Sequence, residues 1–280
     1  MSSQLDALEK ELVNIRSGGI SPITQLLWKH DGDFITGWAR TISQGNSRVL
    51  EVGCGKGGYL VSLASAGNEC YGIDPLSKVS LSFAKEMAKE QDVDIHLLCA
   101  AGENIPFQDE SFDVVLLIST LQHVVNQKEV LLEIRRVLKP GGRLLVSVPQ
   151  LRGVYSARRL AAKVKGAIQA RKDFFTMDFD SKRLRDILTE SGFAILKMRG
   201  RKFLPILLPG LLSVLLKFHR DSMAMKIIEI SDSLADRVHF LASNLIVLCA
   251  KEKQNGAVIP LSDVDFRSTG DGILLDRRPN

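Results

Sequence analysis

Apolar runs and helical patterns alternate along the middle of the chain, from position 47 to position 149. This alternation is typical of βαβ units, in which parallel strands are joined by crossover helices. The predicted strands are 48–52, 69–73, 94–99, 112–118 and 143–148, and the predicted helices are 57–66, 77–90 and 127–138. Because such crossovers are right-handed, we expect an α/β fold, a three-layer αβα sandwich.

The third of these helices is expected to end at the sequence Lys139-Pro140-Gly141-Gly142. Proline cannot continue a helix, and glycine allows the reversed backbone that often follows one. The next strand is therefore expected to start after this turn.

Helical patterns also flank this region. Before it, they cover about 3–15 and 23–43. After it, we expect three helices. The first covers 154–170, the second extends from a cap at Asp180 or Ser181 to a stop at Gly192, and the third covers 222–241. Two further strands are expected at 193–199 and 244–250.

These patterns divide the chain into three parts. We expect an N-terminal helical cap at 1–45, a main domain at 46–251 and a C-terminal tail at 252–280. Helical insertions at 151–192 and 203–241 interrupt the main domain.

A glycine-rich loop follows the first predicted strand, where residues 49–58 read Val-Leu-Glu-Val-Gly-Cys-Gly-Lys-Gly-Gly. Glycines permit positive φ and carry no Cβ, so a ligand can lie against the backbone. Glu51 and Asp74 stand at the ends of the first two strands, and ligands of open α/β sheets bind in the crevice beyond strand ends. A carboxylate at position 74 can accept both hydroxyls of a ribose. The pattern therefore predicts a ribose-containing ligand.

The four cysteines are scattered without the spacing of a zinc site or of a disulfide framework. They are Cys54, Cys70, Cys99 and Cys249. The first residues also lack the basic stretch and apolar run of a signal peptide. These features predict reduced thiols in a cytoplasmic protein, without a metal.

Charge is distributed unevenly along the chain, although the net charge is only +5. The segment 151–220 contains 16 Lys or Arg against 5 Asp or Glu, a local balance of +11. Such a segment favours anionic partners, which include a phosphorylated substrate, an acidic membrane surface and RNA. The apolar stretch 203–216 is too short for a membrane span and is interrupted by Pro205 and Pro209.

The chain resembles the class I S-adenosylmethionine-dependent methyltransferases, in particular their small-molecule branch (methyltransferase type 11, similar to enzymes of ubiquinone and menaquinone biosynthesis). Five blocks carry the resemblance, in the right order and with the right spacing: 49–58, 71–75, 100–115, 121–124 and 131–149. The resemblance implies S-adenosylmethionine as cofactor, S-adenosylhomocysteine as product and a seven-stranded, mostly parallel Rossmann-like sheet of order 3-2-1-4-5-7-6. The helical insertions fall where such enzymes vary.

The resemblance also implies roles for individual residues. Gly53, Gly55 and Gly57 would approach the methionyl part of the cofactor. Glu51 would bond to the loop amides or lie near the methionyl ammonium through water, and Asp74 would take the ribose hydroxyls.

Further residues are expected around the adenine. Ala101, Gly102 and Glu103 would flank this base, Pro75 or Leu76 would pack against it, and Ser119 would complete the cofactor site. The family often has Asp at the position of Ala101, so this chain is expected to hold the base through backbone groups and apolar contact.

The loop also fits the GxGxxG pattern of dinucleotide-binding folds, through Gly53, Gly55 and Gly58. We favour S-adenosylmethionine over NAD because dinucleotide domains require neither Glu51 nor the turn at 139–142.

No catalytic residue stands out in the sequence. His123 follows a strand end and could act as a base near the transferring methyl group, since imidazole titrates near neutrality. The interpretation we favour is that it caps or braces the short helix there. Tyr155, His30 and Trp28 are further candidates for the acceptor pocket, whereas Cys54 is expected to be a packing residue.

Three functions stay open. The first is methyl transfer to a small hydrophobic or anionic acceptor, such as a quinone precursor, isoprenoid or glycolipid, with peripheral contact to an acidic membrane as an added feature. The second is RNA methylation through the basic segment 151–220, although no RNA-binding module is recognised there. The third is a binding protein without turnover.

Overall fold

One seven-stranded sheet organises the computed structural model, which describes residues 22–75, 80–150, 179–201, 214, 217, 221–239 and 242–252. The strand order is β3-β2-β1-β4-β5-β7-β6. All neighbours are parallel except β7, which is antiparallel to both β5 and β6. The predicted fold class and strand order are therefore confirmed.

The elements lie close to their expected positions. The strands are β1 (Arg48–Val52), β2 (Glu69–Ile73), β3 (His96–Leu98), β4 (Phe112–Ile118), β5 (Leu138–Pro149), β6 (Phe193–Arg201) and β7 (Asn244–Lys251). The α-helices are α2 (Pro22–Ser43), α3 (Gly58–Ala64), α4 (Ser80–Glu90), α5 (Gln127–Val137), α7 (Ser181–Glu190) and α10 (Asp221–Arg237). A short 3₁₀ helix, η1 (Leu121–His123), follows β4. The helices expected at 3–15 and 154–170 lie outside the described residues, so the division into domains stays a prediction.

Strand β5 starts earlier than the sequence predicted. Helix α5 ends at Val137 as expected, but Leu138 already pairs with Phe112 of β4. The next pair is Arg143 with Val114, so four residues of β5 lie opposite a single residue of β4. Gly141, with φ of 77°, lies within this irregularity. The expected turn is therefore a bulge inside the strand, held there because Leu138 is fully buried.

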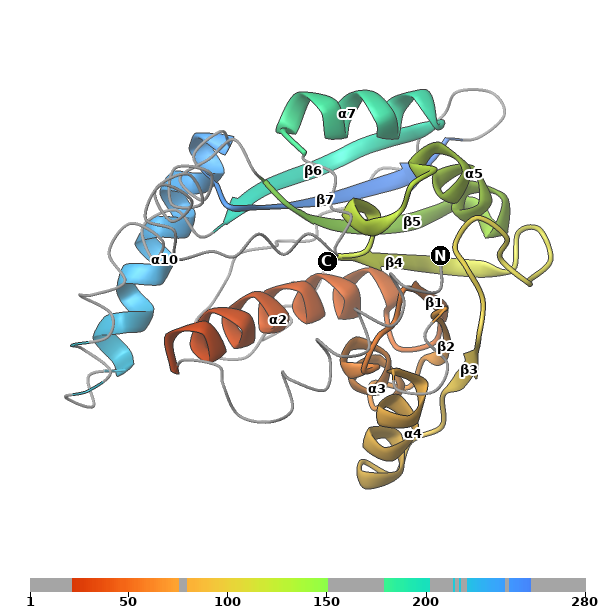
Figure 1. Cartoon of the computed structure of the whole chain (residues 1–280), viewed down its shortest axis with the longest axis horizontal. Coiled ribbons are helices and arrows are strands. Elements are labelled where there is room, and N and C mark those ends of the chain that lie inside the picture. Colours follow the sequence, from red (N-terminus) through yellow and green to blue (C-terminus); the bar gives the residue numbers. More distant parts are fainter. Residues whose placement is uncertain are drawn as a thin grey trace, which may run out of the picture.

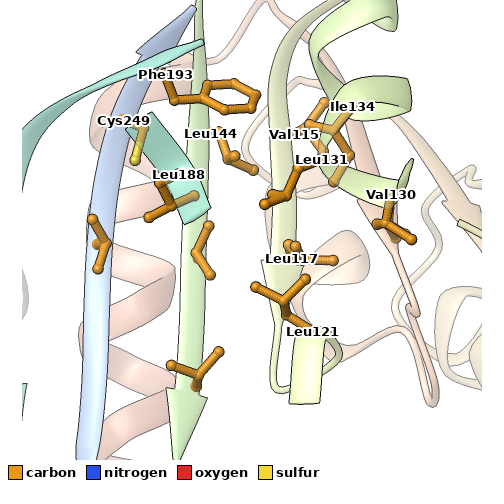
Figure 2. Packing of buried hydrophobic residues seen from close by; sticks show 14 of the residues in the cluster. Val115, Leu117, Leu121, Val130, Leu131, Ile134, Leu144, Leu188, Phe193 and Cys249 are labelled. Atoms are coloured by element: carbon orange, nitrogen blue, oxygen red, sulfur yellow. The ribbon is translucent and has the colours of Figure 1, made fainter. Parts of the chain in front are cut away.

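Two hydrophobic clusters cover the two faces of the sheet. The first joins β4 and β5 to helices α5 and α7, and Figure 2 shows Leu144, Leu188 and Phe193 among its side chains. The second joins β1 and β4 to α2 and α3 and includes Trp38, Leu60 and Leu116. These helices lie on opposite sides of the sheet in Figure 1, which gives the expected three layers. Helix α10 packs against the edge strand β6.

The topology brings several strand ends to one edge of the sheet. Strands β1, β2, β4, β5 and β6 end there, and β7 begins there. The carboxyl edge of such a sheet is where ligands bind in open α/β folds.

An ion pair fastens the loop after β3 to helix α5. Glu133 accepts hydrogen bonds from Ile105 N at 2.9 Å and from Arg136 Nε at 2.8 Å. Arg136 also donates to the carbonyl oxygens of Ile105 and Phe107. The hydrogen bonds from Arg136 hold the pKa of Glu133 below its usual range.

We expect Glu133→Gln to lower the free energy of unfolding by about 1 kcal/mol at pH 7. Because the folded pKa of Glu133 is depressed, the stabilisation is present above the usual pKa of 4.5 and is lost as pH falls through the folded value. Urea unfolding at pH 7 and at pH 4 should therefore show a smaller difference at the lower pH. Glu129→Gln, at an exposed position of the same helix, is the control; an equal loss there would contradict this role for Glu133.

Candidate functional site

The glycine loop after β1 is fastened to the end of β2. Gly53 N and Cys54 N both donate to the carbonyl oxygen of Ile73, at 2.8 and 3.1 Å. Gly55 N donates to Asp74 Oδ2 at 2.9 Å, and Gly57 N donates to the carbonyl oxygen of Cys54. The two carboxylate-bearing strand ends and the loop thus form one hydrogen-bonded unit.

The three loop glycines are subject to two different physical constraints. Gly53, Gly55 and Gly57 all have positive φ. A Cβ at Gly53 would come within 2.3 Å of Thr120 Oγ1, and one at Gly57 within 2.6 Å of the Ala84 Cβ. A Cβ at Gly55 would meet nothing within 4 Å. Gly53 and Gly57 are therefore needed for packing, and Gly55 borders open space where a ligand can approach the backbone.

Glu51 is a buried carboxyl with an unused oxygen. The residue is 2% exposed, and its Oε2 has no hydrogen-bond partner among the described residues. Burial, and after it the negative charge of Asp74, raise the pKa of Glu51 well above its usual range. The hydrogen bonds found for the loop amides go to Ile73, Asp74 and Cys54 rather than to Glu51. A buried acceptor in this state suits a cationic donor such as the methionyl ammonium.

Asp74 follows β2 and is also buried. Its Oδ2 is engaged with Gly55 N, and its own amide donates to the carbonyl oxygen of Leu98 at 3.3 Å. Pro75, next in the chain, is exposed, and its carbonyl oxygen accepts from the thiol of Cys99 at 3.7 Å. The ends of β2 and β3 therefore lie together at the carboxyl edge of the sheet.

The segment expected to flank an adenine follows β3. Ala101 is exposed, and Gly102 and Glu103 are half-buried. A Cβ at Gly102 would come within 3.0 to 3.3 Å of methyl groups of Val52 and Val130, so a side chain there would require these groups to shift by a few tenths of an ångström.

Ser119, at the end of β4, has an uncommon backbone conformation for its residue type. Its φ is 52°, in the left-handed region that favours glycine. Ser119 N donates to the carbonyl oxygen of Ser147 at 2.8 Å, and its own carbonyl oxygen accepts from Gln122 Nε2 at 2.6 Å. Backbone strain of this kind is concentrated at functional sites.

His123 is the last residue of η1 and is exposed. Its Nε2 lies 3.2 Å from Gln122 Nε2, and its amide donates to the carbonyl oxygen of Thr120. At this position His123 could act as a base on the molecule that accepts the methyl group, or it could brace η1. His123 therefore stays a candidate.

The other acceptor-pocket candidates have different surroundings. His30 Nε2 lies 2.9 Å from Asp232 Oδ2, so this histidine joins α2 to α10. Trp28 is 49% exposed on α2. Tyr155 lies outside the described residues.

Cys54 agrees with the expected packing role. It is buried, and burial raises the pKa of its thiol, with smaller effects of the same sign from Glu51 and Asp74. Across the described ranges, no cluster of three or more His, Cys, Asp or Glu side chains could hold a metal ion.

Sequence reasoning missed Tyr59, which directly follows the glycine loop. Burial, Glu51 and Asp31 all raise the pKa of its phenol, in that order of importance, so Tyr59 lies within electrostatic reach of both carboxyls. Its position just after the glycine loop could have identified Tyr59 as a site residue from the sequence. The neighbourhood of Asp31 on α2 could not be seen in the sequence.

Comparison with known proteins identifies related enzymes. A family model described as "Methyltransferase domain" matches residues 50–146. Demethylmenaquinone methyltransferase of Staphylococcus haemolyticus (strain JCSC1435) is 31% identical over 172 residues, which cover 55% of this chain and 71% of that protein. Ubiquinone biosynthesis O-methyltransferase of Rickettsia akari (strain Hartford) is 26% identical, and the match covers 56% of this chain and 62% of that protein.

A solved structure extends the likeness to most of the chain. Magnesium protoporphyrin IX methyltransferase from Synechocystis PCC 6803, with bound S-adenosylhomocysteine, matches with a TM-score of 0.59 and 14% identity. The match covers 84% of this chain and 89% of that one. At this identity the likeness shows the fold alone.

Proposed function

The chain belongs to the S-adenosylmethionine-dependent methyltransferases, and we propose that it methylates a small hydrophobic or anionic acceptor at the crevice beside Glu51, Asp74 and Ser119. The observation that carries this site is the buried Glu51, whose free oxygen faces no protein donor among the described residues, beside a glycine loop with open space at Gly55. An orphaned buried carboxyl calls for a cationic ligand group.

We assign the cofactor-binding roles residue by residue. Glu51 faces the methionyl ammonium, Gly55 lets the ligand approach the backbone, and Asp74 accepts the ribose hydroxyls. Gly53 and Gly57 hold the loop in shape. Pro75 and the segment Ala101-Gly102-Glu103 border the adenine, and Ser119 closes the site on the side of β4.

The protein's own part in the reaction is placement and exclusion of water. When bound, S-adenosylmethionine supplies an electrophilic methyl group on its sulfonium. Correct orientation of two reactants can contribute about 7–11 kcal/mol in favourable cases, so a dedicated catalytic residue is not essential. His123, next to Ser119 in space through Gln122, is the residue we propose for taking a proton from the acceptor.

The relatives favour a small molecule as acceptor. The two relatives named above act, by their names, on demethylmenaquinone and in ubiquinone biosynthesis. A quinone or isoprenoid acceptor would also suit the apolar stretch 203–216, and the basic segment 151–220 would suit an acidic headgroup or membrane surface. RNA, the alternative for the basic segment, has no comparable support.

Transfer of labelled methyl groups tests this function. The protein is incubated with methyl-labelled S-adenosylmethionine and host-cell extract, and the products are separated into lipid, aqueous, RNA and protein fractions. We expect label in the lipid or aqueous small-molecule fraction and none with Asp74→Ala. Label in RNA would favour the alternative, and a lack of S-adenosylhomocysteine formation in every extract would contradict the function.

Contact with an acidic membrane is tested separately. Among the described residues, every helix is too short or too polar to cross a bilayer. We expect co-sedimentation with phosphatidylglycerol vesicles that salt reverses, and none with phosphatidylcholine vesicles. Equal binding to both, or to neither, would contradict peripheral contact through the basic segment.

Alkylation of Cys99 reports on cofactor binding without an acceptor. Cys99 is exposed at the end of β3, whereas Cys54, Cys70 and Cys249 are buried. We expect iodoacetamide to modify Cys99 first, and S-adenosylhomocysteine at ten times its Kd to slow the modification about tenfold. Mass spectrometry of the modified peptide measures the rate, with Cys99→Ser as control. Unchanged alkylation at saturating ligand would place the adenine elsewhere.

A further inference from the structure

A buried group of charges lies at the same edge of the sheet, on the side away from β3. Arg201, the last residue of β6, is 4% exposed. Its Nε lies 3.1 Å from Asp31 Oδ1 on α2, and its Nη2 lies 2.9 Å from Asp232 Oδ2 on α10. The second contact is an ion pair without the alignment of a hydrogen bond.

Two further side chains join this group. His30 Nε2 lies 2.9 Å from Asp232 Oδ2, and Asn244 Nδ2 donates to Asp31 Oδ2 at 3.2 Å. The guanidinium of Arg201 also stacks 3.9 Å above the centroid of the Phe34 ring. Buried polar contacts therefore join α2 to three elements from the other end of the chain, β6, α10 and β7.

Stability alone is a weak reason for such a cluster. Two carboxylates and a guanidinium lose their hydration here, and well-packed hydrophobic residues in place of a buried ion pair are often equally stabilising. Polar networks that persist in cores can instead fix one arrangement of the elements that they join. The position of this polar network in the fold indicates which elements it holds in one arrangement.

The network continues to the acceptor side of the proposed site. Ser147 Oγ donates to Asn244 Oδ1 at 3.4 Å, and the carbonyl oxygen of Ser147 accepts from Ser119 N at 2.8 Å. Ser119, with its left-handed backbone, in turn accepts from Gln122, the neighbour of His123. Polar contacts therefore run from α10 and α2 across β6, β7 and β5 to the end of β4.

The cluster also lies near the cofactor side. Burial, and after it the charges of Glu51 and then of Asp31, raise the pKa of Tyr59, the second residue after Gly57 of the glycine loop. The carboxyls of Asp31 and Glu51 therefore both interact electrostatically with the phenol of Tyr59.

We propose that Arg201, Asp31, Asp232 and Asn244 form a positioning network, which holds α2 and α10 against the sheet and keeps the strained turn at Ser119 in place beside the acceptor. It touches neither substrate nor cofactor and acts through Ser147 and Ser119. The proposal rests on the proposed function, because the turn at Ser119 closes the proposed site on the side of β4 and leads to His123, the residue proposed to take a proton from the acceptor.

Asn244→Ala is the most informative variant. It cuts the link from Asp31 to Ser147 and leaves both ion pairs of Arg201 intact, whereas Arg201→Met would strand two buried carboxylates and endanger folding. Lys29→Ala is the control, since Lys29 forms only an exposed pair with Asp33 on the same helix α2.

Amide hydrogen exchange by NMR, on protein saturated with S-adenosylhomocysteine, is the first measurement. In Asn244→Ala we expect the Ser119 amide to exchange at least about tenfold faster, with the Leu50 amide of β1 unchanged. Lys29→Ala should change neither. Equal exchange at Ser119 in Asn244→Ala and the wild type would overturn the proposal, whatever the acceptor is.

The rate of methyl transfer at saturating S-adenosylmethionine is the second measurement. We expect at least about a tenfold fall in Asn244→Ala per folded molecule, with the Kd for S-adenosylhomocysteine within about threefold of the wild type. A purely structural role would lower the melting temperature and leave the rate well below that temperature unchanged, which would overturn the proposal. If the wild type itself transfers no methyl group, the proposed function fails, and the exchange result still decides the network.

Discussion

Replacing Asp74 with asparagine is expected to weaken binding of S-adenosylhomocysteine roughly 10- to 150-fold, because a charged hydrogen bond is worth about 1.5–3 kcal/mol. Asparagine has nearly the same shape, and its side-chain oxygen can still accept from Gly55 N, which now bonds to Asp74 Oδ2. What the substitution removes is the negative charge toward the ribose hydroxyls.

Calorimetric titration measures this loss directly. Asp94→Asn, an exposed position after α4, is the matched control and should bind as tightly as the wild type. Should Asp74→Asn bind the ligand with unchanged affinity, the assignment of the ribose to Asp74 is wrong. A variant that loses binding together with its folded circular dichroism spectrum would be replaced by Asp74→Glu, which keeps the charge and displaces it by one methylene.

Glu51→Gln is expected to have opposite effects on stability and on binding. In the ligand-free protein at pH 8, we expect the free energy of unfolding to rise by more than about 1 kcal/mol, because the buried Glu51 carboxyl must keep a proton that the unfolded chain releases, whereas the glutamine amide is neutral in both states. The affinity for S-adenosylhomocysteine should fall at least about tenfold, because the methionyl ammonium loses a negative neighbour.

The pH dependence of the stability gain follows from the raised pKa of Glu51. Below the usual carboxyl pKa of 4.5, Glu51 is protonated in both the folded and the unfolded chain, and the variant should match the wild type. As pH rises, the unfolded chain releases this proton while the folded chain retains it, so the wild type loses stability relative to the variant. Urea unfolding from pH 4 to pH 8 measures the difference, and a variant less stable than the wild type at pH 8 would show that Glu51 has a protein partner.

The sequence predicted the elements of the sheet well, because their signals are local. Most of β4, at 114–118, is a continuous apolar run, and helix α5 has clear amphipathic spacing. The start of β5 was misplaced because proline and glycine usually end regular structure, whereas here Leu138 pairs with Phe112 before the bulge. The register between two strands depends on both of them, so it cannot be predicted from the residues of one segment.

The candidate site was predictable only in part. Glu51 stands two residues before Gly53, and Asp74 stands directly before Pro75, so their positions at strand ends could be predicted from the sequence. The different roles of Gly53 and Gly55 depend on Thr120, which follows the neighbouring strand β4. The pairing of Arg201 with Asp31 spans 170 residues, and no periodicity in either segment predicts it.

A crystal structure of the protein with S-adenosylhomocysteine tests the central claim most directly. The account predicts one ligand at the carboxyl edge of the sheet, with its ribose hydroxyls on the Asp74 carboxylate, its ammonium beside Glu51 and its backbone contact at Gly55. A ligand bound elsewhere, or one whose ribose hydroxyls are held by residues other than Asp74, would contradict the account.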